Sequence, residues 1–244
     1  MPKLKVFLMV SSLLIVAGVF GIAGVPVTQK TASPNGQRKV FDEDRFPIVD
    51  YFEPEPGNDT ERDKQRKRSQ KYDKSDWNVN PTAPSDTTVR VDSVDPKLPA
   101  FPFNRASAVV IGTIRKARGY LSNDKTGVYS AFEISIEEVL KNSSRVPFSI
   151  GSLIEAERQG GRVKFPSGRV HLYLVKEQNM PRINSRQVLF LTGGDIDPFF
   201  QILTGYELSD GRVYALDELV QPKTYDNAEE TTFLSDLRSR VSTP

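Results

Sequence analysis

The sequence contains no cysteine. A chain without cysteine forms no disulfide framework, offers no thiolate nucleophile, builds no zinc ribbon and carries no lipid-bearing cysteine of the bacterial lipoprotein type. Any attachment to a membrane must therefore come from the peptide itself. The globular part must likewise reach stability through its hydrophobic core alone.

Histidine is almost absent as well. His171 is the only one, and it lies in Val170–Leu174 with apolar neighbours on both faces of an expected strand. Most Ser-His and metal chemistry needs histidine, and this setting predicts a structural residue. The chain also lacks a G-x-S-x-G elbow, a P-loop and a paired-glycine dinucleotide fingerprint. The sequence therefore favours a protein that is not an enzyme, and it predicts no cofactor and no metal.

Two glutamate pairs are the carboxylates that acid–base chemistry would need, namely Glu137-Glu138 and Glu155-x-Glu157. Glu137, Glu155 and Glu157 fall at outward positions of expected strands, where charge serves solubility. A carboxylate-dependent hydrolase of unrecognised type stays as the alternative function. A pocket that brings carboxylates together with His171 would favour it.

The chain has little excess charge, with 33 basic and 31 acidic residues. After residue 98 it carries 18 basic and 17 acidic residues, so the part that we expect to be globular is nearly neutral. Such a balance creates no field that would gather nucleic acid. Binding of nucleic acid is therefore a second alternative only.

One long apolar run is present, at the N-terminus. Lys3 and Lys5 precede residues 6–25, and twenty residues in a helix cross about 30 Å of hydrocarbon. The sequence predicts a signal anchor over 1–25 with the N-terminus inside and the rest of the chain outside the cytoplasm. The alternative is a signal peptide that is cleaved near Ala23. A cysteine-free exported chain is typical of bacteria.

Residues 26–99 are rich in proline and in charges of both signs and have few apolar residues to bury. This composition predicts a disordered tether. The exception is a short apolar patch over 40–52, which could dock on the domain or on a partner. The basic run KQRKR at 64–68 is interpreted as a solvated charge run.

The clearest half-buried strand is YSAFEISIEEVL, residues 129–140. Phe132, Ile134 and Ile136 alternate with polar residues, the period of two of a strand with one dry face. The alternation fails at Glu138, which predicts a bulge or a strand end there. Further short strands, separated by turns, are expected at 108–114, 151–156, 162–165, 170–175, 188–191, 200–208 and 213–216. The segment 115–126 is expected to be a hairpin or wide loop.

The chain ends in a helical pattern. Asn227 is a suitable cap with Glu230 three residues on, and Phe233, Leu237 and Val241 recur on one stripe. An amphipathic helix is expected over 227–241. The predicted fold of 100–244 is therefore mainly β, a single OB-like barrel or a sandwich, with this helix at its end.

Several core segments together resemble a known kind of domain. They are AVVIG at 108–112, FEISIEEVLK at 132–141, the Gly160-Gly161 turn and VLFL at 188–191. The succession is similar to a small β-barrel domain, OB-like or netrin-like, that occurs in many exported bacterial proteins. The resemblance implies the barrel fold and no particular activity. Netrin-like inhibitors of metalloproteases rely on an N-terminal cysteine and disulfides, so inhibition is not carried over to this chain.

Two groups of residues are candidate contact sites. The first is a basic patch of Arg158, Arg162, Lys164 and Arg169 around an aromatic residue, which suits an anionic envelope polymer, lipid head groups or single-stranded nucleic acid. The second is a loop after Gly193-Gly194, with Asp195, Asp197, Phe199 and Phe200 as possible contacts. The competing interpretation of that loop is a plain strand connection that sends a phenylalanine into the core. The expected function is an extracytoplasmic binding or structural module, tethered through residues 6–25, which presents its barrel to an envelope protein or polymer.

Overall fold

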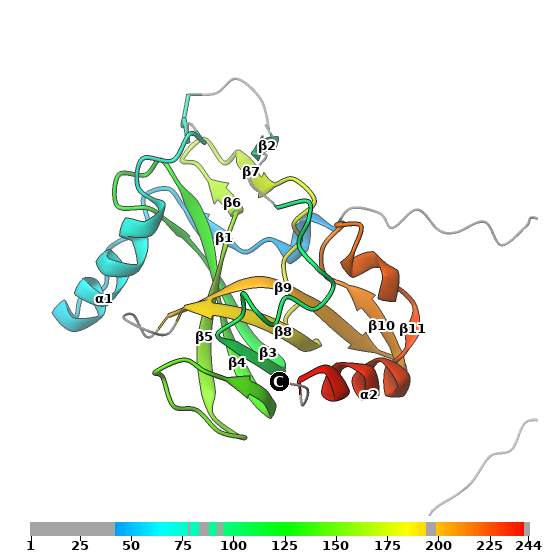
Figure 1. The fold of residues 1–244 in the computed structure, drawn as a ribbon. Helices are drawn as coiled ribbons and strands as arrows, with labels where there is room; N and C mark the ends of the chain where they lie inside the picture. The colour runs from blue at the N-terminus through cyan, green and yellow to red at the C-terminus, as the bar shows by residue number, and fades with distance from the viewer. Residues whose placement is uncertain (1–41, 78, 83–87, 92–94, 194–198, 242–244) are drawn as a thin grey trace, which may run out of the picture. The chain divides into compact units, whose positions relative to one another are not determined.

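The fold is mainly β and comprises two sheets and a C-terminal helix (Figure 1). The structure is a computed structural model that describes residues 42–77, 79–82, 88–91, 95–193 and 199–241. The expected membrane segment 6–25 lies outside these residues. Within the described part, no helix is both long and apolar enough to cross a bilayer.

The larger sheet has seven strands in the order β11-β10-β9-β5-β4-β3-β8. Its members are β3 (Ala108–Leu121), β4 (Val128–Asn142), β5 (Leu153–Gln159), β8 (Arg186–Gly193), β9 (Phe200–Ser209), β10 (Arg212–Ala215) and β11 (Ala228–Glu229). Strand β8 pairs with β9 as well as with β3. The parallel link between β5 and β9 is limited to two residue pairs, Ala156 with Phe200 and Glu157 with Gln201. The strands therefore curl back toward one another without forming a closed barrel.

The pairing of β3 with β4 forms the centre of this sheet. Phe132, Ile134 and Ile136 are buried as the alternation predicted, and they pack in one core with residues of β3, β8 and β9. The register shifts between Ile111 and Gly112, opposite Glu138 and Ile136, so the bulge expected near Glu138 is confirmed. Strand β3 continues to Leu121 through a segment that was expected to be a loop.

The smaller sheet has four strands in the order β1-β6-β7-β2. Its members are β1 (Ile48–Asp50), β6 (Gly161–Lys164), β7 (Val170–Val175) and β2 (Thr88–Val91). The central β6–β7 hairpin is antiparallel, and β1 and β2 each add a parallel strand to one of its edges. Both edge strands come from the segment before residue 100, so that segment forms part of the folded structure.

The predicted tether over 26–99 is therefore wrong for the described residues from Asp42 onward, and the folded part begins well before residue 100. This segment also contains the short helices η1 (Glu43–Arg45) and η2 (Gln70–Tyr72) and the helix α1 (Asp59–Ser69). Phe46 and Trp77 are completely buried, and Trp77 stacks on Tyr173 of β7. Few apolar residues suffice here because each one fills a site on a core that other strands supply.

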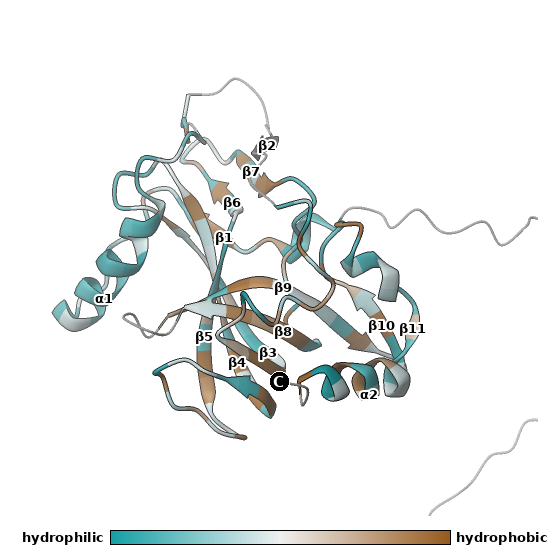
Figure 2. Ribbon diagram, in the orientation of Figure 1, coloured by the Kyte–Doolittle hydropathy of each residue, from teal (hydrophilic) through white to brown (hydrophobic). Residues whose placement is uncertain are grey.

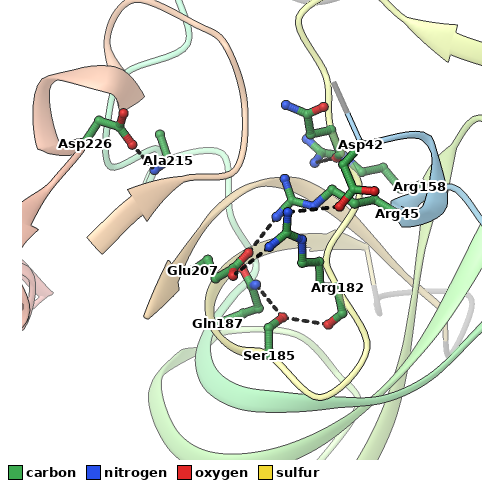
Figure 3. Close-up of polar contacts among 10 residues, drawn as sticks. Asp42, Arg45, Arg158, Arg182, Ser185, Gln187, Glu207, Ala215 and Asp226 are labelled. Carbon is green, nitrogen blue, oxygen red and sulfur yellow. Dashed lines mark hydrogen bonds and ion pairs between the residues drawn. The ribbon is translucent and has the colours of Figure 1, made fainter. Parts of the chain in front are cut away.

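Ion pairs fix the start of this segment to the larger sheet. The Arg45 guanidinium lies 2.6 Å from a carboxylate oxygen of Glu207 on β9, and Arg182 lies 2.9 Å from Asp42 (Figure 3). Burial lowers the pKa of Arg45, although the charge of Glu207 opposes this effect. Ser185 accepts a hydrogen bond from the Gln187 side chain and donates one to the Arg182 carbonyl. These two bonds fix the backbone around Arg182, in the loop before β8. The cluster is thus an anchor for residues 42–46.

The predicted C-terminal helix is confirmed as α2 (Glu230–Val241). Phe233, Leu234 and Leu237 are buried against a second core between the helix and the larger sheet. The helix begins later than expected, because Asn227 has a φ of 65° and the Glu229 side chain instead accepts from the Thr232 amide at 3.0 Å. A short helix η3 (Pro222–Tyr225) precedes it.

Candidate functional site

The predicted basic patch does not form one surface. Arg158 is 3% exposed and lies 2.6 Å from the carboxylate of Asp217, which is equally inaccessible. Its guanidinium also donates to the carbonyls of Asn179 and Leu203. Arg162 donates to the Phe46 carbonyl at 2.8 Å, whereas Lys164 and Arg169 are exposed at the β6–β7 hairpin. Arg158 therefore links β5 to β9 and to the loops that contain Asn179 and Asp217.

The predicted contact loop lies mostly outside the part of the chain that the structure describes. Asp195 and Asp197 are outside the described residues. Phe200 is completely buried in the main core, and Phe199 lies beneath Arg68, whose guanidinium carbon is 4.0 Å from the ring centroid. The interpretation of this loop as a strand connection that sends a phenylalanine into the core is therefore confirmed for Phe200.

The glutamates of β5 were predicted to face solvent, and for Glu157 this was wrong. Its side chain is completely buried, 2.7 Å from Arg68, while Glu155 is half-buried and 2.6 Å from the same guanidinium. Burial opposes the charge on Arg68, but the two carboxylates outweigh it and raise the pKa of this group. The sequence pattern misled here because α1, which brings Arg68, covers this part of the sheet.

Aromatic stacking reinforces the same contact. Tyr72 of η2 stacks on Tyr129 with ring centroids 4.3 Å apart, and Tyr129 stacks in turn on Tyr120 of β3 at 5.2 Å. Ser69 and Tyr129 share a hydrogen bond of 2.9 Å, and the Tyr72 hydroxyl donates to Glu157 at 3.1 Å. Helix α1 and η2 are therefore firmly seated on β3, β4 and β5.

Next to the contact of α1 and η2 with the sheet lies a pocket of about 320 Å³. Three parts of the chain line it: the end of β1 with the segment 53–56, one face of α1, and the end of β3 with its hairpin loop. The lining includes four cationic residues, Arg62, Arg66, Arg118 and Lys125, and two aromatic residues, Tyr51 and Tyr120. We refer to it below as the cationic pocket.

One face of helix α1 lines the cationic pocket. Arg62, Gln65, Arg66 and Ser69 follow the spacing i, i+3, i+4, i+7 and so share one face. The helix has no apolar stripe, and it is hydrophilic over most of its length (Figure 2). Its start is fixed by Asn58, whose side chain accepts from the Thr60 amide at 2.8 Å, and basic residues in its last turn complement the helix dipole.

The hairpin loop between β3 and β4 also lines the pocket. Asp124 organises it by accepting from Ser122, from Thr126 and from the backbone amide of Lys74 at 2.7 Å. Burial acts against the charge on Asp124, but these hydrogen bonds prevail and hold its pKa well below the usual range. Lys125 adopts a φ of 57°, and its ammonium donates to the Tyr51 carbonyl at 3.0 Å and stands over the Tyr51 ring.

Carboxylates of the segment 53–56 hold the three arginines of the pocket. Arg118 is hydrogen-bonded to Glu53, and this hydrogen bond is the main reason that its pKa is raised. Arg62 and Arg66 lie 3.3 and 3.1 Å from the same oxygen of Glu55. The Glu55 and Arg66 side chains are both more than half exposed, so these pairs are open to water.

A second pocket of about 430 Å³ is lined in part by Lys71 and Tyr72 of η2. Its carboxylates are Asp73, Asp95 and Glu157, and each has a partner: Asp95 pairs with Arg105 at 2.6 Å, and Glu157 is held by Arg68. His171 lines neither pocket; it is buried with its ring edge-on to Phe165. Among the described residues no group of three or more acidic, histidine or cysteine side chains is placed to hold a metal.

Sequence reasoning missed the cationic pocket. Its cations come from positions 62, 66, 118 and 125, and no local motif joins them. One usable signal was present, because Asn58-Asp59-Thr60-Glu61 followed by a basic run matches the capping and charge pattern of a helix. Comparison with known proteins gives no family for the chain, since no family model and no curated protein matches it.

Proposed function

We propose that this protein is an extracytoplasmic binding module, tethered to the membrane through residues 6–25, whose cationic pocket binds an anionic polymer of the cell envelope. The observation that carries the proposal is the convergence of Arg62, Arg66, Arg118 and Lys125 on one pocket that is open to solvent. Exposed ion pairs contribute only about 0.2–1 kcal/mol each. An anionic ligand therefore competes readily with the internal carboxylates for these arginines.

The arrangement of the strands supports a binding role. The order β3-β4-β5-β9-β8, with β5 parallel to β9, resembles the partly open five-stranded barrel of OB-like domains. OB-like domains bind oligonucleotides and oligosaccharides on the face of their second and third strands and at the loop between the first and second. In this chain the corresponding loop is 122–127, which supplies Lys125 to the pocket. Helix α1 covers part of the corresponding face.

The hydrolase alternative gains no support from the two pockets. The carboxylates of the second pocket are paired, and His171 lies elsewhere. The nucleic-acid alternative also involves an anionic polymer, but it conflicts with the expected export of the chain. A binding experiment therefore includes single-stranded DNA as a competing probe.

Binding is tested by titrating the full chain, in detergent, with anionic and neutral envelope polymers in a calorimeter. Arg66→Ala and Arg118→Ala are each expected to weaken binding to the anionic polymer about fivefold, because each removes a charge-assisted hydrogen bond. Arg240→Ala is the matched control: Arg240 is as exposed as Arg66 and is paired with Asp236 on α2. Equal affinity of all four proteins, or equal binding of neutral polymers, would contradict the proposal.

The proposed location is tested separately. An intact anchor over 6–25 keeps the protein in the membrane fraction after a carbonate wash, whereas recovery of a soluble chain that begins near Gly24 indicates cleavage after Ala23. Trypsin added to spheroplasts is expected to shorten the chain and release its resistant domain, because the domain then lies outside the cytoplasmic membrane. Survival of the full-length chain in intact spheroplasts would contradict export.

A further inference from the structure

We propose that Glu53 and Glu55 are an internal competitor for the cationic pocket, and that the ligand replacing them is a phosphodiester-linked polyol chain whose successive phosphates take the places of the two carboxylates. This inference rests on the proposed function and names the ligand class and the regulation of the same pocket.

The two glutamates divide the three arginines of the pocket into two sites. Glu53 is hydrogen-bonded to Arg118 on β3, and Glu55 lies between Arg62 and Arg66 on α1. The pocket thus has a site with one arginine and a site with two. A ligand that fills both sites needs two anionic groups on one chain.

Proline sets the spacing of the two carboxylates. Glu53 and Glu55 each precede a proline, and this restricts both to extended backbone conformations. Two residues of such a chain advance about 6 Å, so the carboxylates branch from points about 6 Å apart. Consecutive phosphates joined through a three-carbon polyol have a comparable separation. Phosphates in inorganic polyphosphate are joined through a single oxygen and lie closer together.

Arginine geometry favours phosphate over carboxylate as the ligand group. Arg66 reaches both oxygens of Glu55 through a single nitrogen, whereas Arg62 approaches one of them through Nε and also pairs with Asp59 at 3.0 Å. The guanidinium fork of Arg66 is thus only partly used by Glu55. A phosphodiester offers two charged oxygens and two bridging oxygens to such a pair, and the guanidinium fork matches phosphate geometry. A phosphate therefore makes more hydrogen bonds at this site than the Glu55 carboxylate does.

The aromatic rings of the pocket favour a chain without bases. Tyr120 is stacked on Tyr129 and has the Arg118 guanidinium 5.3 Å from its centroid. The ring of Tyr51 has the Lys125 ammonium 4.6 Å from its centroid. Single-strand binding uses aromatic faces on which bases stack. Since cations already approach both rings, a polyol phosphate suits the pocket better than a nucleic acid does.

Displacement of the two carboxylates changes the charge of the pocket. Its lining contains four basic and three acidic residues, and two of the acidic ones are Glu53 and Glu55. When both side chains turn to solvent, four cations face Asp50 alone. The pocket is therefore nearly neutral when empty and strongly cationic when a ligand displaces the glutamates.

The test compares the full chain with Glu53→Gln/Glu55→Gln, using synthetic poly(glycerol phosphate) as the probe and calorimetry as the readout. The double variant is expected to bind about three- to tenfold more tightly, because two competing charges are removed. The control is Glu138→Gln/Glu218→Gln, which changes the net charge equally and also removes two exposed, ion-paired carboxylates. Its affinity is expected to match that of the unaltered chain. Circular dichroism melting verifies that all three proteins are folded.

The outcomes separate the inference from the proposed function. If the unaltered chain binds the polymer and neither double variant gains affinity, the competitor is refuted while the binding function stands. An equal gain in both double variants also refutes it, because long-range charge then explains the effect. Tighter binding of single-stranded DNA, of polyglucuronate or of inorganic polyphosphate overturns the ligand class. Absence of binding to every anionic probe overturns the proposed function itself.

Discussion

Arg68 connects the N-terminal segment to the sheet through charge. Its buried guanidinium contacts Glu155, Glu157 and the face of Phe199. Removal of one partner from a buried ion pair leaves the other charge without compensation, which costs about 3–5 kcal/mol. Arg68→Met is therefore expected to lower the free energy of unfolding by about 3 kcal/mol, as measured by urea denaturation.

The control for Arg68 lies two residues earlier on the same helix. Arg66 is largely exposed and pairs only with Glu55 among the described carboxylates. Arg66→Met is expected to change the free energy of unfolding by about 0.5 kcal/mol or less. Arg68→Met/Glu157→Gln is expected to recover part of the lost stability. Equal effects of the two single changes would show that the Arg68 contact is not buried in solution.

Tyr72 makes stability depend on alkaline pH. Burial, and then the charge and the hydrogen bond of Glu157, raise the pKa of Tyr72 well above its usual value. The folded protein therefore keeps a proton that the unfolded chain releases above about pH 10, so stability falls as the pH rises past that value. The stability contribution linked to this pKa shift is complete below about pH 10.

The variant Tyr72→Phe removes this proton from both states. Its free energy of unfolding is expected to fall less steeply between about pH 10 and 11.5, by up to about 1.4 kcal/mol per pH unit. Urea denaturation at several pH values measures the two slopes. The slope of the variant does not vanish, because burial also raises the pKa of Tyr173 to about 12. Identical slopes would show that Tyr72 is exposed in solution.

Among the elements, η2 depends on a glycine of a distant hairpin. A Cβ atom at Gly127 would overlap the carbonyl oxygen of Tyr72. Gly127→Ala is therefore expected to push η2 and α1 away from the sheet and to destabilise the protein by about 1–3 kcal/mol. Hydrogen exchange is expected to speed up in the amides of α1 and η2 before those of β3 and β4.

Gly57 supplies the matched control, since no atom lies within 4 Å of a Cβ placed there. Gly57→Ala should leave hydrogen exchange of η2 unchanged and stability within about 0.5 kcal/mol. If both alanine variants exchange alike, η2 is not seated against the hairpin.

The elements differ in how well the sequence predicts them. Strand β4 was predictable because the alternation of Phe132, Ile134 and Ile136 directly reflects one buried face. Hydrophobic periodicity could not predict helix α1, because all its residues are polar and it rests on the sheet through Arg68 and Ser69 rather than through an apolar stripe; only its cap and charge pattern indicated a helix. A hydrophobic pattern cannot reveal a helix that contacts the sheet through charged and polar side chains.

At the scale of the whole molecule, limited proteolysis can show where the folded part begins. Trypsin is expected to leave a resistant fragment that begins near Asp42, because Phe46, Trp77 and the α1–η2 contact fix this segment to the sheets. The basic run at 64–68 is expected to be cut slowly. Mass spectrometry of the fragments measures the outcome. A resistant fragment that begins between about 95 and 108 would restore the tether prediction.

The cationic pocket could not be predicted from the sequence for a topological reason. Its cations become neighbours only when α1 docks beside the β3–β4 hairpin, and that docking depends on Tyr72 and Arg68. The predicted basic patch failed for the opposite reason. Arg158 lies near Arg162 and Lys164 in the chain, but its side chain points into the molecule toward Asp217.

The parallel pairing of β1 with β6 also determines the order in which the molecule can assemble. Val49 pairs with Val163, and Arg45 pairs with Glu207, 162 residues later in the chain. Contacts between such distant residues form late because a long loop must close first. If the chain is exported from its N-terminus, as proposed, residues 42–77 leave first and must wait for their partners. The cationic pocket therefore also depends on β5, because Glu155 and Glu157 hold Arg68 of α1 against the sheet, and a chain cut short before β5 is expected to lack the pocket.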